Sequence, residues 1–236
     1  MKLKINSHSA FTLAEVLITL GIIGVVAALT IPVIISRNQS KSLEAGLKKG
    51  ASVISQALLS YENDNGEPIK SDISVAGQQL GDKIIKYFKV VTDCGYSYSS
   101  DSNLKGCVPF VQGDSADKSS TLYKTLNGSK VIDLTFFDDR QFILADGSMI
   151  FLENNVWERT YISIDVNGYI KGPNRLGQDL FMFQLDTNGR LIPMGAEGTD
   201  YYSENDEYCS KTSTNEMNGA GCTYKALGDT KYFSSF

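Results

Sequence analysis

The chain has 236 residues and a formal net charge of −5, with 22 Lys plus Arg against 27 Asp plus Glu. This length allows one or two domains with a sizeable core. The acidic balance argues against nucleic acid as a partner, because phosphate binding needs a basic face. The single histidine, His8, precedes the first apolar run, so a chain cleaved after it has no imidazole. This excludes Ser-His-Asp and Cys-His catalysis and histidine metal sites, and we expect no enzyme.

The N-terminus begins with a short basic segment and continues into an almost wholly apolar run. Residues 11–35 contain one charged residue, Glu15. As a helix this run would be about 37 Å long, enough to span a bilayer core of roughly 30 Å. Lys2 and Lys4 precede it with no acidic residue in residues 1–10. The positive-inside rule therefore predicts a cytoplasmic N-terminus, a single membrane pass and a head outside the cytoplasm.

Glu15 is unusual in such a run. An acidic side chain at the centre of a membrane helix costs about 2.5–3.5 kcal/mol on insertion scales, so a retained one indicates a function and a partner. The alternative is a plain signal anchor, in which Glu15 lies at the headgroup level and stays hydrated. That alternative requires no cleavage and treats the residues around Glu15 as coincidence.

Ala10, the string FTLAE at residues 11–15 and the apolar run to Pro32 resemble the class III signal of type IV prepilins and type II secretion pseudopilins. The resemblance implies that a prepilin peptidase cuts between Ala10 and Phe11 and that Phe11 is then N-methylated. It also implies that Glu15 meets the terminal amine of a neighbouring subunit during assembly. Pro32 matches a proline common near the end of the pilin membrane segment. Ala10 replaces the usual Gly, and we expect slower or equal processing because Ala is the next smallest residue.

This interpretation divides the chain into four segments. Residues 1–10 are a cytoplasmic leader that is removed, and residues 11–35 are a transmembrane and assembly helix. Residues 36–65 continue that helix as an amphipathic segment, and residues 66–236 form a globular head outside the cytoplasm with two disulfide loops. The amphipathic segment is predicted from apolar residues at spacings of three or four, which are Leu43, Leu47, Ala51, Ile54, Leu58 and Tyr61.

Pro32 lacks a backbone donor and Gly21 lowers helix propensity, so we expect the helix to be weakest between these two residues.

From residue 130 the pattern changes to that of strands separated by turn residues. We expect a short helix within 78–91 and strands at 131–137, 141–145, 148–152, 161–166 and 180–185. These strands would form an antiparallel meander with one face packed on the helix. The predicted fold class is α+β: a long N-terminal membrane-spanning helix packed on an antiparallel β-sheet head, similar to pilins.

The chain has four cysteines, Cys94, Cys107, Cys209 and Cys222. An even number after an export segment indicates disulfides in an oxidising compartment. Three pairings are possible, and the equal short spacing favours Cys94 with Cys107 and Cys209 with Cys222. The alternative is a four-thiolate zinc site, whose ligands usually come as Cys-x2–4-Cys pairs that this chain lacks.

The tail, residues 198–236, has few aliphatic residues and five tyrosines that could either form a contact surface or pack the tail onto the head, namely Tyr201, Tyr202, Tyr208, Tyr224 and Tyr232. The sequence does not choose between these two roles.

A calcium loop could be built from Asp165, Asn167, Asn174 and Asp179. The resemblance supports this idea, because major pseudopilins often hold calcium in a C-terminal loop. Against it, the Gly stands at the fourth position rather than the sixth of an EF-hand, and no Glu follows at the twelfth. The same Asp-x-Asn-Gly string recurs at 186–189, which is typical of a turn. We therefore expect no cofactor, with calcium as the open alternative.

The function implied by the resemblance is a structural subunit of a type IV pilus or a type II secretion pseudopilus. Its partners would be prepilin peptidase, the inner-membrane assembly platform, membrane lipid and other copies of itself or related pilins in an extracytoplasmic filament. The alternative is a signal-anchored, adhesin-like ligand-binding protein that does not polymerise. An anchored hydrolase would need a carboxylate dyad, and the adjacent residues Asp138 and Asp139 in a turn are not expected to form one.

Overall fold

The computed structural model describes residues 12–69, 77–96, 106–108, 123–156 and 159–236. The chain forms two compact units, divided between Lys41 and Ser42. Helix α1, Leu13–Asn65, extends through that division and includes Pro32 in its interior. The stretch expected to be weakest, between Gly21 and Pro32, is thus helical in this structure.

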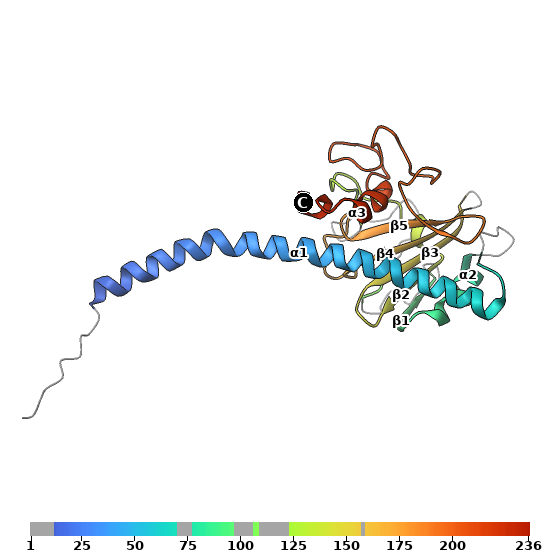
Figure 1. Cartoon of the computed structure of the whole chain (residues 1–236), viewed down its shortest axis with the longest axis horizontal. Helices are drawn as coiled ribbons and strands as arrows, with labels where there is room; N and C mark the ends of the chain where they lie inside the picture. Colours follow the sequence, from blue (N-terminus) through green and yellow to red (C-terminus); the bar gives the residue numbers. More distant parts are fainter. Residues whose placement is uncertain (1–11, 70–76, 97–105, 109–122, 157–158) are drawn as a thin grey trace, which may run out of the picture. The chain divides into compact units, whose positions relative to one another are not determined.

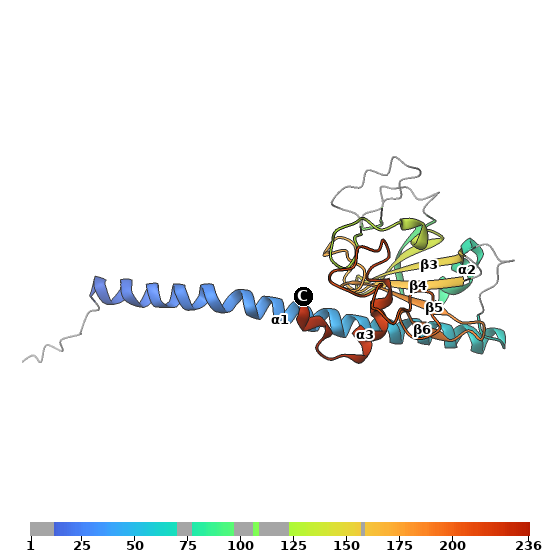
Figure 2. The ribbon, with the colours of Figure 1, turned by 90° about the horizontal axis from the view of Figure 1, so that it is seen from above.

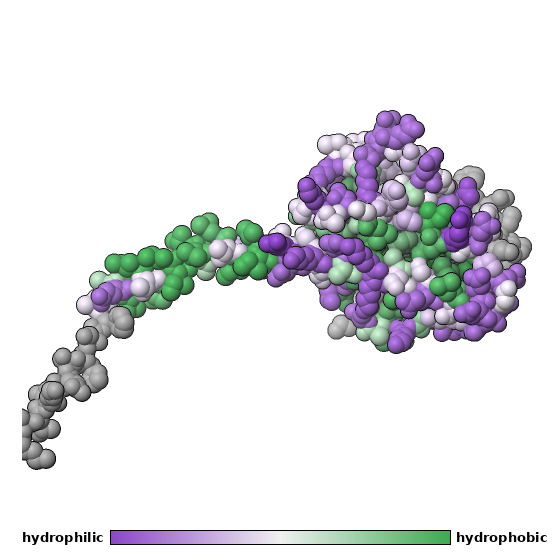
Figure 3. Space-filling model, in the orientation of Figure 1, coloured by the Kyte–Doolittle hydropathy of each residue, from purple (hydrophilic) through white to green (hydrophobic). Residues whose placement is uncertain are grey.

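The first unit presents an apolar helix surface. Figure 3 shows apolar residues along most of its visible face, and the exposed large side chains there are Leu13, Val16, Leu17, Ile18, Leu20, Ile22, Ile23, Val25, Val26, Leu29, Ile31, Val33, Ile34 and Ile35. Among the described residues, α1 is the one helix long and apolar enough to cross a membrane. A surface of this extent needs lipid or another apolar partner to cover it.

The second unit is built on a six-stranded sheet in which each strand pairs antiparallel with the next one in the chain. The strands, seen in Figure 1, are β1 Val90–Gly95, β2 Arg140–Leu144, β3 Met149–Val156, β4 Arg159–Asp165, β5 Leu180–Leu185 and β6 Leu191–Pro193. This order is a meander, as the sequence predicts. Together with α1 it gives an α+β, pilin-like architecture.

The C-terminal part of α1 packs against one face of this sheet. Leu47 and Ile54 are fully buried and belong to one apolar core with Ile162 and Phe183 of the sheet. A Cβ built on Gly50 would lie 2.4 Å from Cδ1 of Ile164, so glycine lets the helix approach the strands closely. Figure 2 shows this part of α1 and the strands as two layers.

The opposite face of the sheet carries a second core, because successive side chains of a strand point to opposite faces. Phe151 and Met182 face this side and pack with Tyr123, Met194 and Ala220 from the segments that cover it. The sheet is therefore buried on both faces.

Short helices complete the second unit, and their bounds are α2 Gly77–Ile84, η1 Ile85–Tyr87, η2 Leu134–Phe137, η3 Ala220–Cys222, α3 Thr223–Gly228 and η4 Tyr232–Ser235. The helix expected within 78–91 therefore ends at Tyr87, and the last residues of that range begin β1.

The strand expected at 131–137 is wrong. Val131 makes only an isolated bridge to Lys124, and the following residues form η2. Asp133 caps η2 by accepting a hydrogen bond from the backbone N–H of Thr135 at 3.0 Å. A side chain that satisfies a free N–H in this way favours a helical turn over an extended strand.

The two edges of the sheet are irregular. The β1–β2 pairing contains two register shifts, between Val90 and Thr92 and between Asp93 and Gly95. At the other edge, β6 has three residues and ends at Pro193, which has no backbone N–H to donate.

The structure joins Cys94 to Cys107 and Cys209 to Cys222, with Cα–Cα distances of 5.7 and 4.9 Å. These are the pairs that the spacing favours. Cys222 is fully buried in the core beneath α1, so the second link attaches the tail to the head.

We expect a Cys209→Ala/Cys222→Ala double variant to lose about 3 kcal/mol of stability, because a closed loop of about 14 residues restricts the unfolded chain by roughly that amount. Thermal unfolding of the full chain in detergent, followed by circular dichroism, measures the loss. Reduced wild-type protein loses the Cys94–Cys107 link as well and should melt at least as low as the variant. An unchanged melting temperature in the variant would show that the tail is held by packing alone.

Candidate functional site

The N-terminal end of α1 holds Glu15 in a capping box. The Glu15 Oε2 atom accepts hydrogen bonds from the backbone N–H and the hydroxyl of Thr12, both at 2.8 Å. The Thr12 hydroxyl in turn accepts from the N–H of Glu15 at 3.3 Å. This reciprocal pattern satisfies donors that a helix start leaves free. Within the single chain the carboxylate is therefore occupied locally.

The sequence places the processing residues immediately before this cap, and Ala10 and Phe11 lie outside the described residues. Leu13 and Val16 are exposed next to Glu15, so the carboxylate lies on an apolar helix surface. An acid in such surroundings is favourable only when it is hydrated or paired. Pro32, the other predicted assembly residue, is exposed within the same helix.

The loop between β4 and β5 contains the calcium candidates and begins and ends with buried carboxylates. Asp165 and Asp179 are both fully buried, and the loop is closed by a hydrogen bond from the N–H of Val166 to the carbonyl oxygen of Asp179 at 2.9 Å. The Asp179 carboxylate accepts from the N–H groups of Asn174 and Arg175, both at 2.7 Å. Neither carboxylate has an ion pair in the portion of the chain that the structure describes.

Two amide side chains of this loop have buried oxygens with no donor. The Nδ2 atom of Asn167 donates to the carbonyl of Gly172 at 2.7 Å, and that of Asn174 donates to the carbonyl of Tyr169 at 2.8 Å. These bonds fix both amides, yet neither Oδ1 atom has a hydrogen-bond partner. Buried polar atoms are normally satisfied, so these two amide oxygens are exceptions in the loop.

Burial raises the pKa of Asp165 to about 6. Burial, followed by the negative charge of Asp165, raises the pKa of Asp179 to about 7. The hydroxyl of Tyr123, itself fully buried, donates to Asp165. These residues offer carboxylate and amide oxygens, which are hard donors and suit calcium rather than a thiophilic metal. The residues thus fit the ion that the resemblance implies, although the spacing is not that of an EF-hand.

Residues 5–31 match the family described as the prokaryotic N-terminal methylation motif. The chain carries the class III prepilin signal. This signal is shared by type IV pilins and pseudopilins, and here it overlaps the capped, apolar start of α1. The prepilin signal and the apolar helix together fit membrane anchoring. No curated protein and no solved structure matches the chain.

Beyond the prepilin signal and the loop, the structure forms a carboxylate cluster that the sequence analysis missed. One carboxylate oxygen from each of Asp138, Asp139 and Glu153 lies within 4.8 Å of the others. The sequence interpretation considered only the adjacent pair in a turn. The register of the β2–β3 hairpin would have indicated the cluster. Arg140 pairs with Leu152, so the preceding residue, Asp139, lies opposite Glu153.

Three of the five tail tyrosines take the packing role that the sequence left open. The Tyr201 ring lies 5.2 Å from the Tyr208 ring, centroid to centroid, and the buried Tyr232 donates its hydroxyl to the carbonyl of Gly177 at 2.5 Å. These three pack the tail onto the head. Tyr202 and Tyr224 are exposed.

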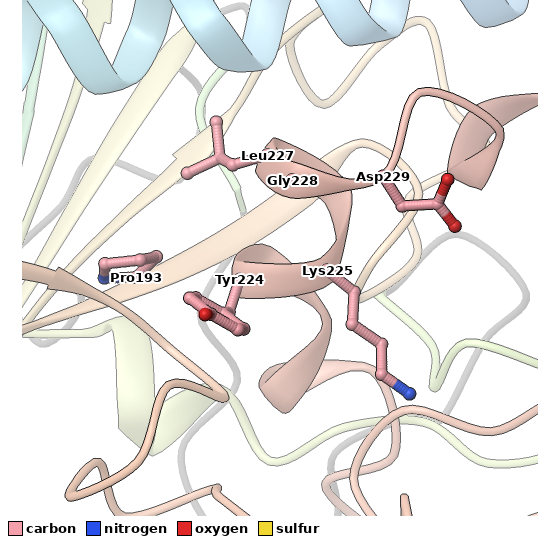
Figure 4. Close-up of a pocket in the computed structure, with 6 residues that line it drawn as sticks. All are labelled: Pro193, Tyr224, Lys225, Leu227, Gly228 and Asp229. Carbon is pink, nitrogen blue, oxygen red and sulfur yellow. The ribbon is translucent and has the colours of Figure 1, made fainter.

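An open hollow of about 420 Å³ lies between β6 and α3 (Figure 4), lined by Pro193, Tyr224, Lys225, Leu227, Gly228 and Asp229. Figure 4 shows the Lys225 side chain pointing away from Pro193, and its ammonium group pairs with Asp206. The hollow is mainly apolar and presents no set of converging catalytic groups.

Proposed function

We propose that the chain is a structural subunit of a type IV pilus or a type II secretion pseudopilus. Prepilin peptidase cuts it between Ala10 and Phe11, Phe11 is N-methylated, and the mature chain polymerises through α1. The observation that carries this proposal is the coincidence of the prepilin signal with a helix of 53 residues that is exposed and apolar at its start and buried against a sheet further on.

The proposed location follows from the same helix. Residues 11–35 span the inner membrane with the head outside the cytoplasm, and the inner-membrane assembly platform moves the mature chain from lipid into a filament. The exposed apolar surface supports this path, since it can be covered either by lipid or by the helices of other copies or related pilins.

Processing gives the direct test. In a host with prepilin peptidase, we expect the intact mass of membrane-extracted protein to correspond to residues 11–236 plus one methyl group. An Ala10→Gly variant should give the same mass, because Gly is the smaller residue, and in pulse-chase labelling it should mature at least as fast. A full-length, unmethylated mass for wild type would remove the subunit proposal and leave the plain signal anchor.

We also propose that the β4–β5 loop binds calcium through Asp165, Asn167, Asn174 and Asp179. The unsatisfied Oδ1 atoms of the two asparagines support this proposal, because their amide groups are already fixed by hydrogen bonds to the loop backbone. Calcium bound here would neutralise two buried carboxylates and stabilise the loop between two central strands.

A further inference from the structure

We propose that Asp138, Asp139 and Glu153 form a second, separate site for a hard divalent cation. Asp138 and Asp139 precede β2, whereas Glu153 comes from β3. One oxygen from each lies within 4.8 Å of the other two, a separation that a single ion can bridge when each oxygen binds it at about 2.0–2.6 Å.

Glu153 supplies the observation that points to a ligand. The residue is 5% exposed, and its Oε2 atom is buried without a hydrogen-bond partner. A buried carboxylate oxygen left without a donor or a cation is costly. The Glu153 carboxyl group already hydrogen-bonds the carboxyl group of Asp138, so its unsatisfied atom is Oε2, and a cation can satisfy that oxygen where a further acceptor could not.

The electrostatics of the cluster agree with this geometry. Burial and the negative charges of Asp139 and Asp138 raise the pKa of Glu153 far above its ordinary range. Burial also raises the pKa of Asp139, although its carboxylate accepts a hydrogen bond from the N–H of Asn154 at 2.7 Å. A divalent ion bound to these oxygens would offset the mutual repulsion of the three carboxylates.

The chemical class of the ion follows from the ligands. Three carboxylates without thiolate or imidazole favour calcium, magnesium or manganese over zinc or copper. An ion bound here would link the segment that follows η2 to β3. It would thereby hold that segment against the sheet. This inference does not depend on polymerisation or on the calcium loop, which involves other residues.

The test counts bound calcium on the full chain in detergent. After treatment with a chelator, wild type, Glu153→Gln and Glu216→Gln are equilibrated with calcium chloride, and bound calcium is measured by equilibrium dialysis and elemental analysis. Glu216 has a side chain that is 83% exposed and serves as the matched control. We expect Glu153→Gln to bind one ion fewer than wild type and Glu216→Gln to bind the same number. The affinity expected is that of extracellular modules, with a Kd of about 10⁻⁴–10⁻³ M.

Asp179→Asn separates this site from the β4–β5 loop. If both sites bind calcium, each single variant should bind one ion fewer than wild type, and the double variant two fewer. If the loop binds no calcium, the difference in bound calcium between wild type and Glu153→Gln still tests the cluster. If Glu153→Gln binds as many ions as wild type, the cluster binds no calcium and the proposal is wrong. If Glu153→Gln fails to fold by circular dichroism, Asp139→Asn, at a half-buried position, is measured instead under the same criterion.

Discussion

A Glu15→Val variant should remain in the membrane and be cut normally, yet disappear from filaments. Valine makes the apolar start of α1 more apolar, so insertion is maintained or improved. Cleavage creates a positive amine at Phe11, and a carboxylate held near it on a neighbouring chain gains about 4 kcal/mol at an effective dielectric constant of about 20. Losing that attraction should reduce the filament fraction by orders of magnitude. The measurement compares mature protein in membranes with protein in sheared filaments when the variant is the only copy present.

The capping box adds a second arm to this experiment. In the single chain the Glu15 carboxylate accepts both hydrogen bonds from Thr12, so pairing with a neighbour requires an exchange of partners. Thr12→Ala removes the hydroxyl and keeps the carboxylate, and we expect this variant still to enter filaments. Glu44→Val is the control, because it removes a carboxylate from the same helix but within the second unit. We expect this variant to enter filaments. Efficient assembly of Glu15→Val would rule out the pairing mechanism, and loss of the variant from both fractions would assign Glu15 to stability or processing.

The second large effect should be a dependence of head stability on pH that calcium reverses. The pKa values of Asp165 and Asp179 are raised from 3.8 to about 6 and about 7 in the folded chain. At pH values between the unfolded pKa of 3.8 and these raised pKa values, the folded state binds more protons than the unfolded state. The free energy of unfolding therefore falls as pH rises from about 4 through 7. The fall should amount to several kcal/mol, because each pKa unit corresponds to about 1.4 kcal/mol.

Calcium should restore the stability lost at neutral pH, because the ion takes the place of the protons. Thermal melts of the full chain in detergent, with chelator or with calcium chloride across this pH range, measure both effects. Asp179→Asn should reduce the pH dependence, to which Asp165 and Glu153 also contribute, and it should weaken the calcium response. Asp186→Asn, in the second Asp-x-Asn-Gly turn, should change neither. A calcium response of Asp179→Asn equal to that of wild type would contradict the loop site.

Much of the fold is predictable because local patterns and tertiary packing agree. The stripe that includes Leu47 and Ile54 predicts the buried side of α1, and short apolar runs separated by turn residues predict β2 to β5. Strand β1 was missed because Val91 is exposed and its neighbours resemble the end of an amphipathic helix. Strand β6 was missed because three residues ending in proline carry too little pattern. At 131–137 the capping side chain of Asp133 outweighs an apolar run that is otherwise typical of a strand.

The site residues divide along similar lines. Glu15 is predictable because its neighbours along the chain form a specific motif. The calcium candidates are predictable as a set of oxygen donors, but the unsatisfied state of Asn167 and Asn174 depends on hydrogen bonds to Gly172 and Tyr169 that the sequence does not indicate. Glu153 was missed because its partnership with Asp139 depends on strand register, which is set by the whole hairpin rather than by either residue's neighbours.

The blunted sheet edges have a consequence for chains held close together. A regular edge strand offers a row of free N–H and C=O groups to which another strand can add, and this is a common route to aggregation. Here the register shifts in β1 interrupt that row at one edge, and Pro193 removes a donor at the other. Heads crowded side by side therefore lack a template for merging their sheets into a continuous cross-β array. Their contacts must be made by side chains, which leaves each head an independently folded body however densely the chains are packed.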